Sequence, residues 1–182
     1  MRLGKTVKCF IAKDGRKVVL RTPKWEDLDD LLKLINSLVD EGAEIVKNKK
    51  FTREEEVTWL ASVIDRVQKG ETSFLVAEVE GKVVASSDVN PRTGYESHVG
   101  TVGIVIKQGY RDLGIGTEIM QTQICFAGKM GLKVLMLSAF ASNRRAIHVY
   151  EKVGFAQNGR VPRKFFKGGK YVDEVIMTYL LE

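Results

Sequence analysis

The chain has 182 residues, of which 44% are hydrophobic and 29% are charged, and its formal net charge is +6 at pH 7. A chain of this length and apolar content predicts one domain, residues 1–182, and no segment approaches the roughly 20 apolar residues that a membrane helix requires. Because the N-terminus lacks the apolar run of a signal peptide, and Cys9 and Cys125 have neither paired nor metal-ligand spacing, we expect a cytoplasmic protein without a metal site or a membrane partner.

The first half of the chain alternates between strand and helix patterns. Residues 7–12 and 18–21 are typical of strands, and they flank Asp14-Gly15, which is a hairpin turn signal. A helix over about residues 26–41 has an apolar stripe formed by Leu28, Leu31, Leu32, Ile35 and Leu38. A second helix over residues 54–69 has a stripe formed by Val57, Leu60, Ala61 and Ile64. Residues 73–79 and 83–89 then form another hairpin.

A strand, a glycine-bearing turn and a helix come next. Residues 97–106 predict a central strand, and the helix after the turn has an apolar side formed by Ile115, Ile119, Phe126, Ala127 and Met130. The first N–H groups of such a helix lack intrahelical partners and its dipole is positive at this end, so the turn predicts a phosphate site. Gly114 and Gly116 would let the backbone approach a ligand closely. Two glycines alone are weak support, because they match neither the dinucleotide fingerprint nor the P-loop.

The segment after this helix adds a second strand and a second helix to the pattern around the two glycines. Residues 134–137 form a continuous apolar run, which is typical of a strand covered on both faces, and the predicted strand covers residues 134–139. Asn143 precedes a helical pattern over 144–153, and Gly154 stands where a helix-ending glycine is expected. Residues 155–159 and 171–180 complete the predicted sheet.

This order of elements and motifs resembles the GNAT superfamily of N-acetyltransferases over residues 17–181, with an acyl-CoA core at about 97–156. The acyl-CoA motif corresponds to Arg111, Gly114 and Gly116. The second motif corresponds to Asn143, Ala146, Tyr150, Glu151, Gly154 and Phe155. The strand at 7–12 is an addition outside the resemblance. The tail at 165–177 is similar to the ends of spermidine and ribosomal-protein N-terminal acetyltransferases.

The resemblance implies a fold and a cofactor site. The fold is a single α/β domain with a mixed, mostly antiparallel sheet, helices on both faces and a splayed pair of parallel strands. Acetyl-CoA, the co-substrate, would lie where these strands part. Its pantetheine arm would bind along the strand at 97–106, at Ile104, Val105 and Ile106. The pyrophosphate would be cradled by the backbone of Arg111, Asp112, Leu113, Gly114, Ile115, Gly116 and Thr117. The resemblance also implies that Asn143, Ala146 and Tyr150 bind the cofactor.

Tyr150 is the candidate general acid, because a phenol is protonated at neutral pH and can give its proton to a thiolate. The alternative is that Tyr150 only packs, since Ala146 and Val149 share its face. Asn143 either hydrogen-bonds the cofactor or caps its helix, and both roles are compatible. Asp112 departs from the family pattern: its carboxylate would disfavour a pyrophosphate unless it points away, and it could cap the following helix.

The general base is predicted less firmly. Glu96 ranks first and His98 second, because both precede the central strand and share one face. His98 lies eight residues before Ile106, or about 26 Å along a straight strand, which argues against direct contact with the thioester. Glu41 and Glu44, between the first two helices, are alternatives, and each single candidate can also be a solvated side chain. If none is the base, the amine enters deprotonated.

The predicted function is direct acetyl transfer from acetyl-CoA to a primary amine on a polyamine, an amino acid, a protein N-terminus or a lysine. A polyamine would require acidic groups to converge, and Asp88 joins Glu41, Glu44 and Glu96 as candidates. A non-catalytic acyl-CoA-binding or sensing module is the alternative, although it would not need Tyr150. A basic interaction domain would instead use two charge clusters, formed by Lys47, Lys49, Lys50 and Arg53, and by Arg160, Arg163, Lys164, Lys167 and Lys170. No nucleic-acid motif accompanies them, so we expect no such partner; a homodimer is compatible with this assignment.

Overall fold

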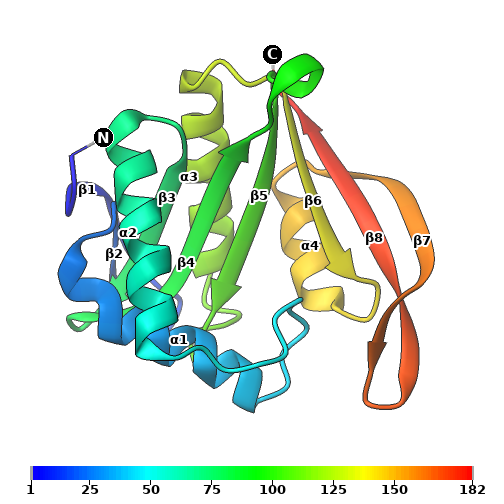
Figure 1. Cartoon of the computed structure of the whole chain (residues 1–182), viewed down its shortest axis with the longest axis horizontal. Coiled ribbons are helices and arrows are strands. Elements are labelled where there is room, and N and C mark those ends of the chain that lie inside the picture. Colours follow the sequence, from blue (N-terminus) through cyan, green and yellow to red (C-terminus); the bar gives the residue numbers. More distant parts are fainter. Residues whose placement is uncertain (1, 182) are drawn as a thin grey trace.

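The computed structural model describes residues 2–181, which form one eight-stranded sheet with helices on both faces (Figure 1). The strands are β1 (Thr6–Ile11), β2 (Lys17–Arg21), β3 (Ser73–Val79), β4 (Lys82–Pro91), β5 (Val99–Ile106), β6 (Val134–Phe140), β7 (Ala156–Lys167) and β8 (Lys170–Leu180). The helices are α1 (Leu28–Asp40), α2 (Arg53–Lys69), α3 (Ile115–Lys129) and α4 (Arg144–Lys152), with short 3-10 turns η1 (Trp25–Asp27) and η2 (Gly94–Glu96). The strand order is β1-β2-β3-β4-β5-β6-β8-β7.

The predicted fold class is confirmed, and the one parallel pair within residues 2–181 positions the site. β5 pairs with β4 along its length, but it pairs with β6 only from Val99 to Thr101. Beyond Thr101 the two strands diverge, as Figure 1 shows. The C-terminal half of β5 therefore has an edge that no neighbouring strand covers.

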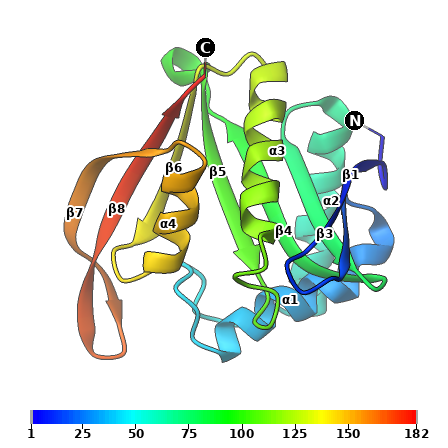
Figure 2. The same ribbon diagram turned by 180° about the vertical axis from the view of Figure 1, so that it is seen from behind.

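The core divides between the two faces of the sheet. The face covered by α1 and α2 buries a cluster that includes Leu34, Leu60 and Phe74. The opposite face is covered by α3 and α4, seen from behind in Figure 2, and it buries Met120, Leu135 and Tyr150 among others. Apolar side chains on alternate positions of β5 reach both clusters, because successive residues of a strand point to opposite faces.

The predicted apolar stripe of α2 is only partly correct. Leu60 and Ile64 are buried, but Val57 is 37% exposed and Glu56 is buried in its place. Thr52 caps α2 and its hydroxyl accepts a hydrogen bond from the N–H of Glu55. This start directs Glu56 and the residues one and two turns later toward the sheet, so a carboxylate occupies a position that the pattern assigned to solvent.

The C-terminal hairpin is longer than predicted. β7 extends from Ala156 to Lys167, beyond the predicted end at residue 159, and most of the second basic cluster lies on it. Pro162 interrupts the strand pattern in the sequence, but it lies where the register shifts between Val161 and Phe165. A proline in a bulge removes no ladder hydrogen bond, so the strand continues past it.

Candidate active site

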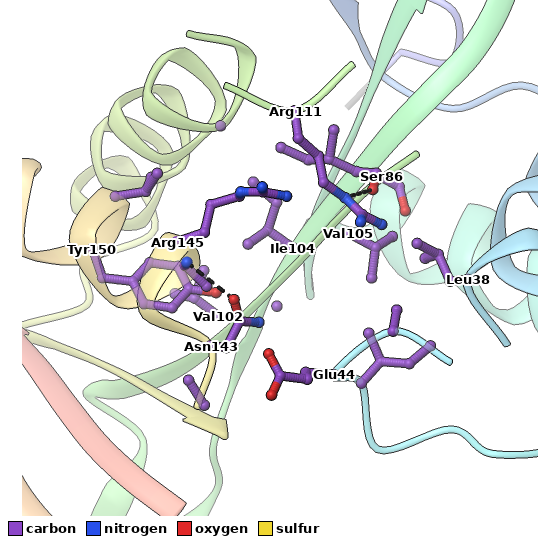
Figure 3. A pocket seen from close by; sticks show the side chains of 18 of the residues that line it. Leu38, Glu44, Ser86, Val102, Ile104, Val105, Arg111, Asn143, Arg145 and Tyr150 are labelled. Atoms are coloured by element: carbon purple, nitrogen blue, oxygen red, sulfur yellow. Dashed lines mark hydrogen bonds between the residues drawn. The ribbon is translucent and has the colours of Figure 1, made fainter. Parts of the chain in front are cut away.

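A cavity of about 1140 Å³ lies where β5 and β6 part, and both motifs line it (Figure 3). Of the predicted cofactor-binding residues, those that line the cavity are Ile104, Val105, Ile106, Arg111, Asp112, Leu113, Gly114, Gly116, Thr117, Asn143, Ala146 and Tyr150. Ile115 is the exception, because its side chain is buried in the core beneath the turn. In Figure 3, Tyr150 and Asn143 lie on one side of β5 and Leu38 and Glu44 on the other.

The open edge of β5 presents backbone groups to this cavity. The N–H of Lys107 donates to the carbonyl of Val84 on β4. Because alternate residues direct their N–H groups to opposite edges of a strand, the N–H groups of Ile106 and Ile104 point away from β4. The Ile106 carbonyl accordingly accepts a hydrogen bond from the Nε of Arg111 at 2.9 Å on that side. This edge can hydrogen-bond an extended amide-bearing arm.

The turn before α3 has the geometry of an anion site. Gly114 is the N-cap in a left-handed conformation, with φ of 89°, and no atom lies within 4 Å of the position that a Cβ would occupy. The first backbone hydrogen bond to Gly114 comes from the N–H of Glu118, so the intervening N–H groups lack intrahelical partners. Gly116 has a different role, because a Cβ there would lie 3.2 Å from Ile106 Cδ1. Gly114 thus opens the turn to a ligand, and Gly116 permits close packing of α3 on β5.

Asp112 does not cap α3. It has a left-handed backbone, with φ of 64°, and Gly114 takes the cap position without a side-chain hydrogen bond. The Asp112 carboxylate instead forms an ion pair with Arg145 of α4, with Nε and Oδ1 at 3.2 Å. The pair offsets the charge that would disfavour a pyrophosphate and holds a second guanidinium beside the turn. The motifs did not indicate Arg145, which also lines the cavity.

The N-terminal hairpin braces this turn from outside. The N–H of Lys13 donates to the carbonyl of Leu113 at 3.1 Å. Arg16 donates to the carbonyl of Gly109 at 3.1 Å, and its guanidinium lies 4.3 Å from the centre of the Tyr110 ring. The turn between β1 and β2, which lies outside the family resemblance, therefore contributes to the shape of the anion site.

On α4, Asn143 and Tyr150 occupy the wall opposite α1 and α2. The Asn143 side chain accepts a hydrogen bond from the N–H of Ala146, which confirms the helix-capping interpretation. Tyr150 is 8% exposed, and burial raises the pKa of its phenol to about 12. Within the described residues its hydroxyl has no hydrogen-bond partner, so the protonated O–H is available to a group in the cavity.

Asp88 approaches β5 from the other face. In the sheet register it stands between Phe74 on β3 and Gly103 on β5. A Cβ at Gly103 would lie 2.7 Å from Asp88 Oδ1, so the carboxylate leans over the β5 backbone toward the open edge. Burial raises the pKa of this carboxyl, opposed by a hydrogen bond from Asn90 and by the charge of Arg66.

Glu56 is a second carboxylate in the cavity. It is 4% exposed, and burial raises the pKa of its carboxyl from 4.5 to about 7. Neither a hydrogen bond nor an ion pair reaches its side chain from the described part of the chain. Nothing in the sequence marks Glu56 apart from its position three residues after Arg53, the first residue of α2.

The model of the acetyltransferase (GNAT) family matches residues 33–155 of this sequence. The chain belongs to that family. It is an acetyl-CoA-dependent N-acetyltransferase.

Similar proteins cover most of this acetyltransferase. The N-alpha-acetyltransferase of Sulfurisphaera tokodaii is 26% identical over 171 residues, which cover 87% of this chain and 92% of that protein. Camello of Xenopus tropicalis is 36% identical over 85 residues, but these cover 47% of this chain and only 39% of camello. The structure of yncA from Salmonella typhimurium, solved with its cofactor acetyl-CoA, superposes with a TM-score of 0.81 at 18% identity, covering 91% and 94% of the two chains. The relatives also include an L-amino acid N-acetyltransferase of Escherichia coli, so they do not single out the spermidine and ribosomal-protein subgroup.

The structure of the acetyltransferase does not bring Glu96 and His98 to the cavity. Both are exposed and precede β5, at the opposite end of the strand from Ile106, and Glu96 forms an ion pair with Arg92 at 2.9 Å. Two alternatives lie closer. Glu41 forms an ion pair with Arg111, and Glu44 lines the cavity and accepts a hydrogen bond from Ser142.

No helix within residues 2–181 combines the length and apolar content that crossing a membrane demands. Over the same residues, no three or more His, Cys, Asp or Glu side chains gather in a way that could hold a metal ion. Cys9 and Cys125 are both free and exposed.

Proposed function

We propose that this acetyltransferase moves the acetyl group directly from acetyl-CoA to a primary amine, with Asp88 as the base and Tyr150 as the acid. The acceptor amine belongs to a polyamine, an amino acid, a protein N-terminus or a lysine. One observation carries the proposal: the half-buried carboxylate of Asp88 and the buried phenol of Tyr150 line one cavity from opposite faces of the sheet, on either side of the open edge of β5.

The proposed binding mode follows from the backbone groups of the cavity. The pantetheine arm hydrogen-bonds along β5 at Ile104 and Ile106, beside Val105. The pyrophosphate lies at the turn that ends in Gly114, where the helix N-terminus and the guanidinium of Arg145 favour negative charge. An N–H of β5 faces the carbonyl oxygen of the thioester as that oxygen gains charge, a contact often worth about 3 kcal/mol in the transition state.

In the proposed transfer step, the amine nitrogen attacks the thioester carbon, and Asp88 accepts the amine proton directly or through a water. The carbon–sulfur bond breaks, and the thiolate takes the proton of the Tyr150 hydroxyl. Solvent later returns a proton to Tyr150 and removes one from Asp88. The raised pKa of each group suits this role, because it keeps the phenol protonated and makes the carboxylate a stronger base.

The experiment is a thiol-release assay with acetyl-CoA and a panel of primary amines. Tyr150→Phe keeps the ring and its packing but removes the O–H, so kcat should fall about 100- to 10,000-fold with little change in acetyl-CoA affinity. Asp88→Asn should lower kcat over a similar range, and Glu96→Gln is the matched control. A Tyr150→Phe enzyme that keeps most of its kcat would leave the phenol as a core residue. Thermal stabilisation by acetyl-CoA without thiol release from any amine would favour the binding or sensing module instead.

A further inference from the structure

Glu56 is a buried residue whose carboxylate opens to the cavity without a hydrogen-bond or ion-pair partner among the described residues. The residue is 4% exposed and lines the same cavity as Asp88. A buried carboxylate is costly unless an opposite charge or hydrogen-bond donors compensate it. In residues 2–181 no side chain supplies such compensation to Glu56, and burial alone shifts its pKa. A cation brought by a ligand would supply the missing partner.

Glu56 and Asp88 line the cavity from α2 and β4 respectively. Trp59 of α2 packs edge-on against Phe74, with ring centroids 5.5 Å apart, and Phe74 stands opposite Asp88 in the register. Glu56 precedes Trp59 by three residues, which places it about 5 Å further along the helix axis. Both carboxylates therefore lie on the α1 and α2 side of the cavity, where one extended ligand can contact each of them.

The wall between and around the two carboxylates is apolar. It is formed by Leu34, Ile35, Leu38, Trp59, Phe74 and Val105. Lys47 also lines this end of the cavity, but its ammonium lies over the Phe51 ring, 5.3 Å from the centroid. This part of the cavity thus combines two negative groups with an apolar spacer region, and Arg111, which also lines the cavity, is paired with Glu41.

We propose that the acceptor is a small linear diamine or polyamine, whose reacting amine lies at Asp88 and whose second ammonium group binds Glu56. The apolar wall contacts the methylene chain between the two nitrogens. Because Glu56 is almost fully buried, the second cation has to enter the cavity, which a slender diamine can do and a protein lysine with its backbone cannot. This inference rests on the proposed function, since it names the acceptor of the same site.

The test compares three acceptors of one chain length in the thiol-release assay: 1,4-diaminobutane, n-butylamine and 4-aminobutyrate. They place a positive charge, a methyl group and a negative charge at the end remote from the reacting amine. We expect wild-type kcat/KM to be about 10- to 100-fold higher for the diamine than for butylamine, the range of a hydrogen-bonded charge pair. The aminobutyrate should be the poorest acceptor. A series from 1,3-diaminopropane to 1,6-diaminohexane measures the spacing between the two subsites.

Glu56→Gln removes the charge while keeping the shape of the side chain. It should lower kcat/KM for the diamine to about the butylamine value, leave butylamine unchanged and improve 4-aminobutyrate. Glu54→Gln, an exposed position on the same first turn of α2, is the matched control and should change none of the three. The KM for acetyl-CoA should stay constant in both variants.

Several results would overturn the inference while leaving the proposed function intact. They are equal wild-type use of diamine and butylamine, an equal loss of both in Glu56→Gln, or acetylation of other amines but not of diamines. If no amine releases thiol, the proposed function fails, and thermal stabilisation by the diamine still decides the inference. Stabilisation of the wild type but not of Glu56→Gln supports the Glu56 subsite, and equal effects refute it.

Discussion

Ionisation of Glu56 should make the folded protein less stable as the pH rises. The carboxyl has a pKa of about 7 in the folded protein and an ordinary value of 4.5 when it is exposed on unfolding. Between these two values the folded state binds more protons than the unfolded state, so the free energy of unfolding falls with increasing pH. Each pH unit between the two pKa values is worth about 1.4 kcal/mol. Above pH 7 the full cost of ionising Glu56 is therefore about 3 kcal/mol.

Glu56→Gln isolates this cost, because glutamine has nearly the same shape and never ionises. The difference in unfolding free energy between variant and wild type should shift in favour of the variant by about 3 kcal/mol from pH 4 to pH 8.5. For a domain of this size 1 kcal/mol corresponds to about 2–4 °C in Tm. Urea unfolding at several pH values, or thermal scans over the same range, measures the shift without any substrate.

The buried amide of Glu56→Gln has an effect on the free energy of unfolding that does not depend on pH. Comparing the difference between variant and wild type at several pH values removes this constant effect. Glu54→Gln serves as the exposed control and should show no comparable trend. A pH-independent difference between Glu56→Gln and wild type would mean that Glu56 is not held in a desolvated site. Saturating diamine should also reduce the penalty in the wild type, because a bound ammonium offsets the carboxylate charge.

Three further substitutions test other parts of the site. Gly114→Val should abolish acetyl-CoA binding in calorimetry, because φ of 89° strains a β-branched residue; unchanged binding by a protein with native circular dichroism would place the cofactor elsewhere. Arg145→Ala should weaken acetyl-CoA binding several-fold at low salt and less at high salt, because its side chain is exposed and its charge is screened; a salt-independent loss would point to packing instead. Gly103→Ala should lower kcat about 10- to 100-fold at unchanged acetyl-CoA affinity, because its Cβ would displace Asp88; full activity would argue against Asp88 as the base.

The sequence predicted the parts of the site that depend on local pattern. The turn at Gly114, the cap at Asn143 and the position of Tyr150 each follow from residues close together in the chain, where spacing determines structure. For Tyr150 the family motif favours a role in the cavity, whereas Ala146 and Val149 on its face favour packing; the structure places it both in the cavity wall and in the core cluster.

The positions of Asp88 and Glu56, the two carboxylates proposed to bind the acceptor, do not follow from local sequence pattern. Asp88 reaches the edge of β5 because the register sets it opposite Gly103, which is a contact between separate strands. Glu56 lies within a polar run at the start of α2, and only the docking of α2 on the sheet shows that this position faces inward. Glu96 and His98 precede β5 in the sequence, but the strand runs from them toward the cavity and leaves them at its far end.

The alternation of β5 explains why the proposed acid and base come from opposite layers of the protein. Ile104 and Ile106 pack toward α3, whereas Val105 packs toward α1 and α2, on the face where Asp88 lies over Gly103. Tyr150 approaches from the α4 side. A fully paired sheet would keep these two faces apart. Because β6 leaves β5 after Thr101, a ligand bound along the open edge of β5 can contact both faces at once. In the proposed mechanism this divergence lets Asp88 accept the amine proton on one face while Tyr150 protonates the leaving thiolate on the other.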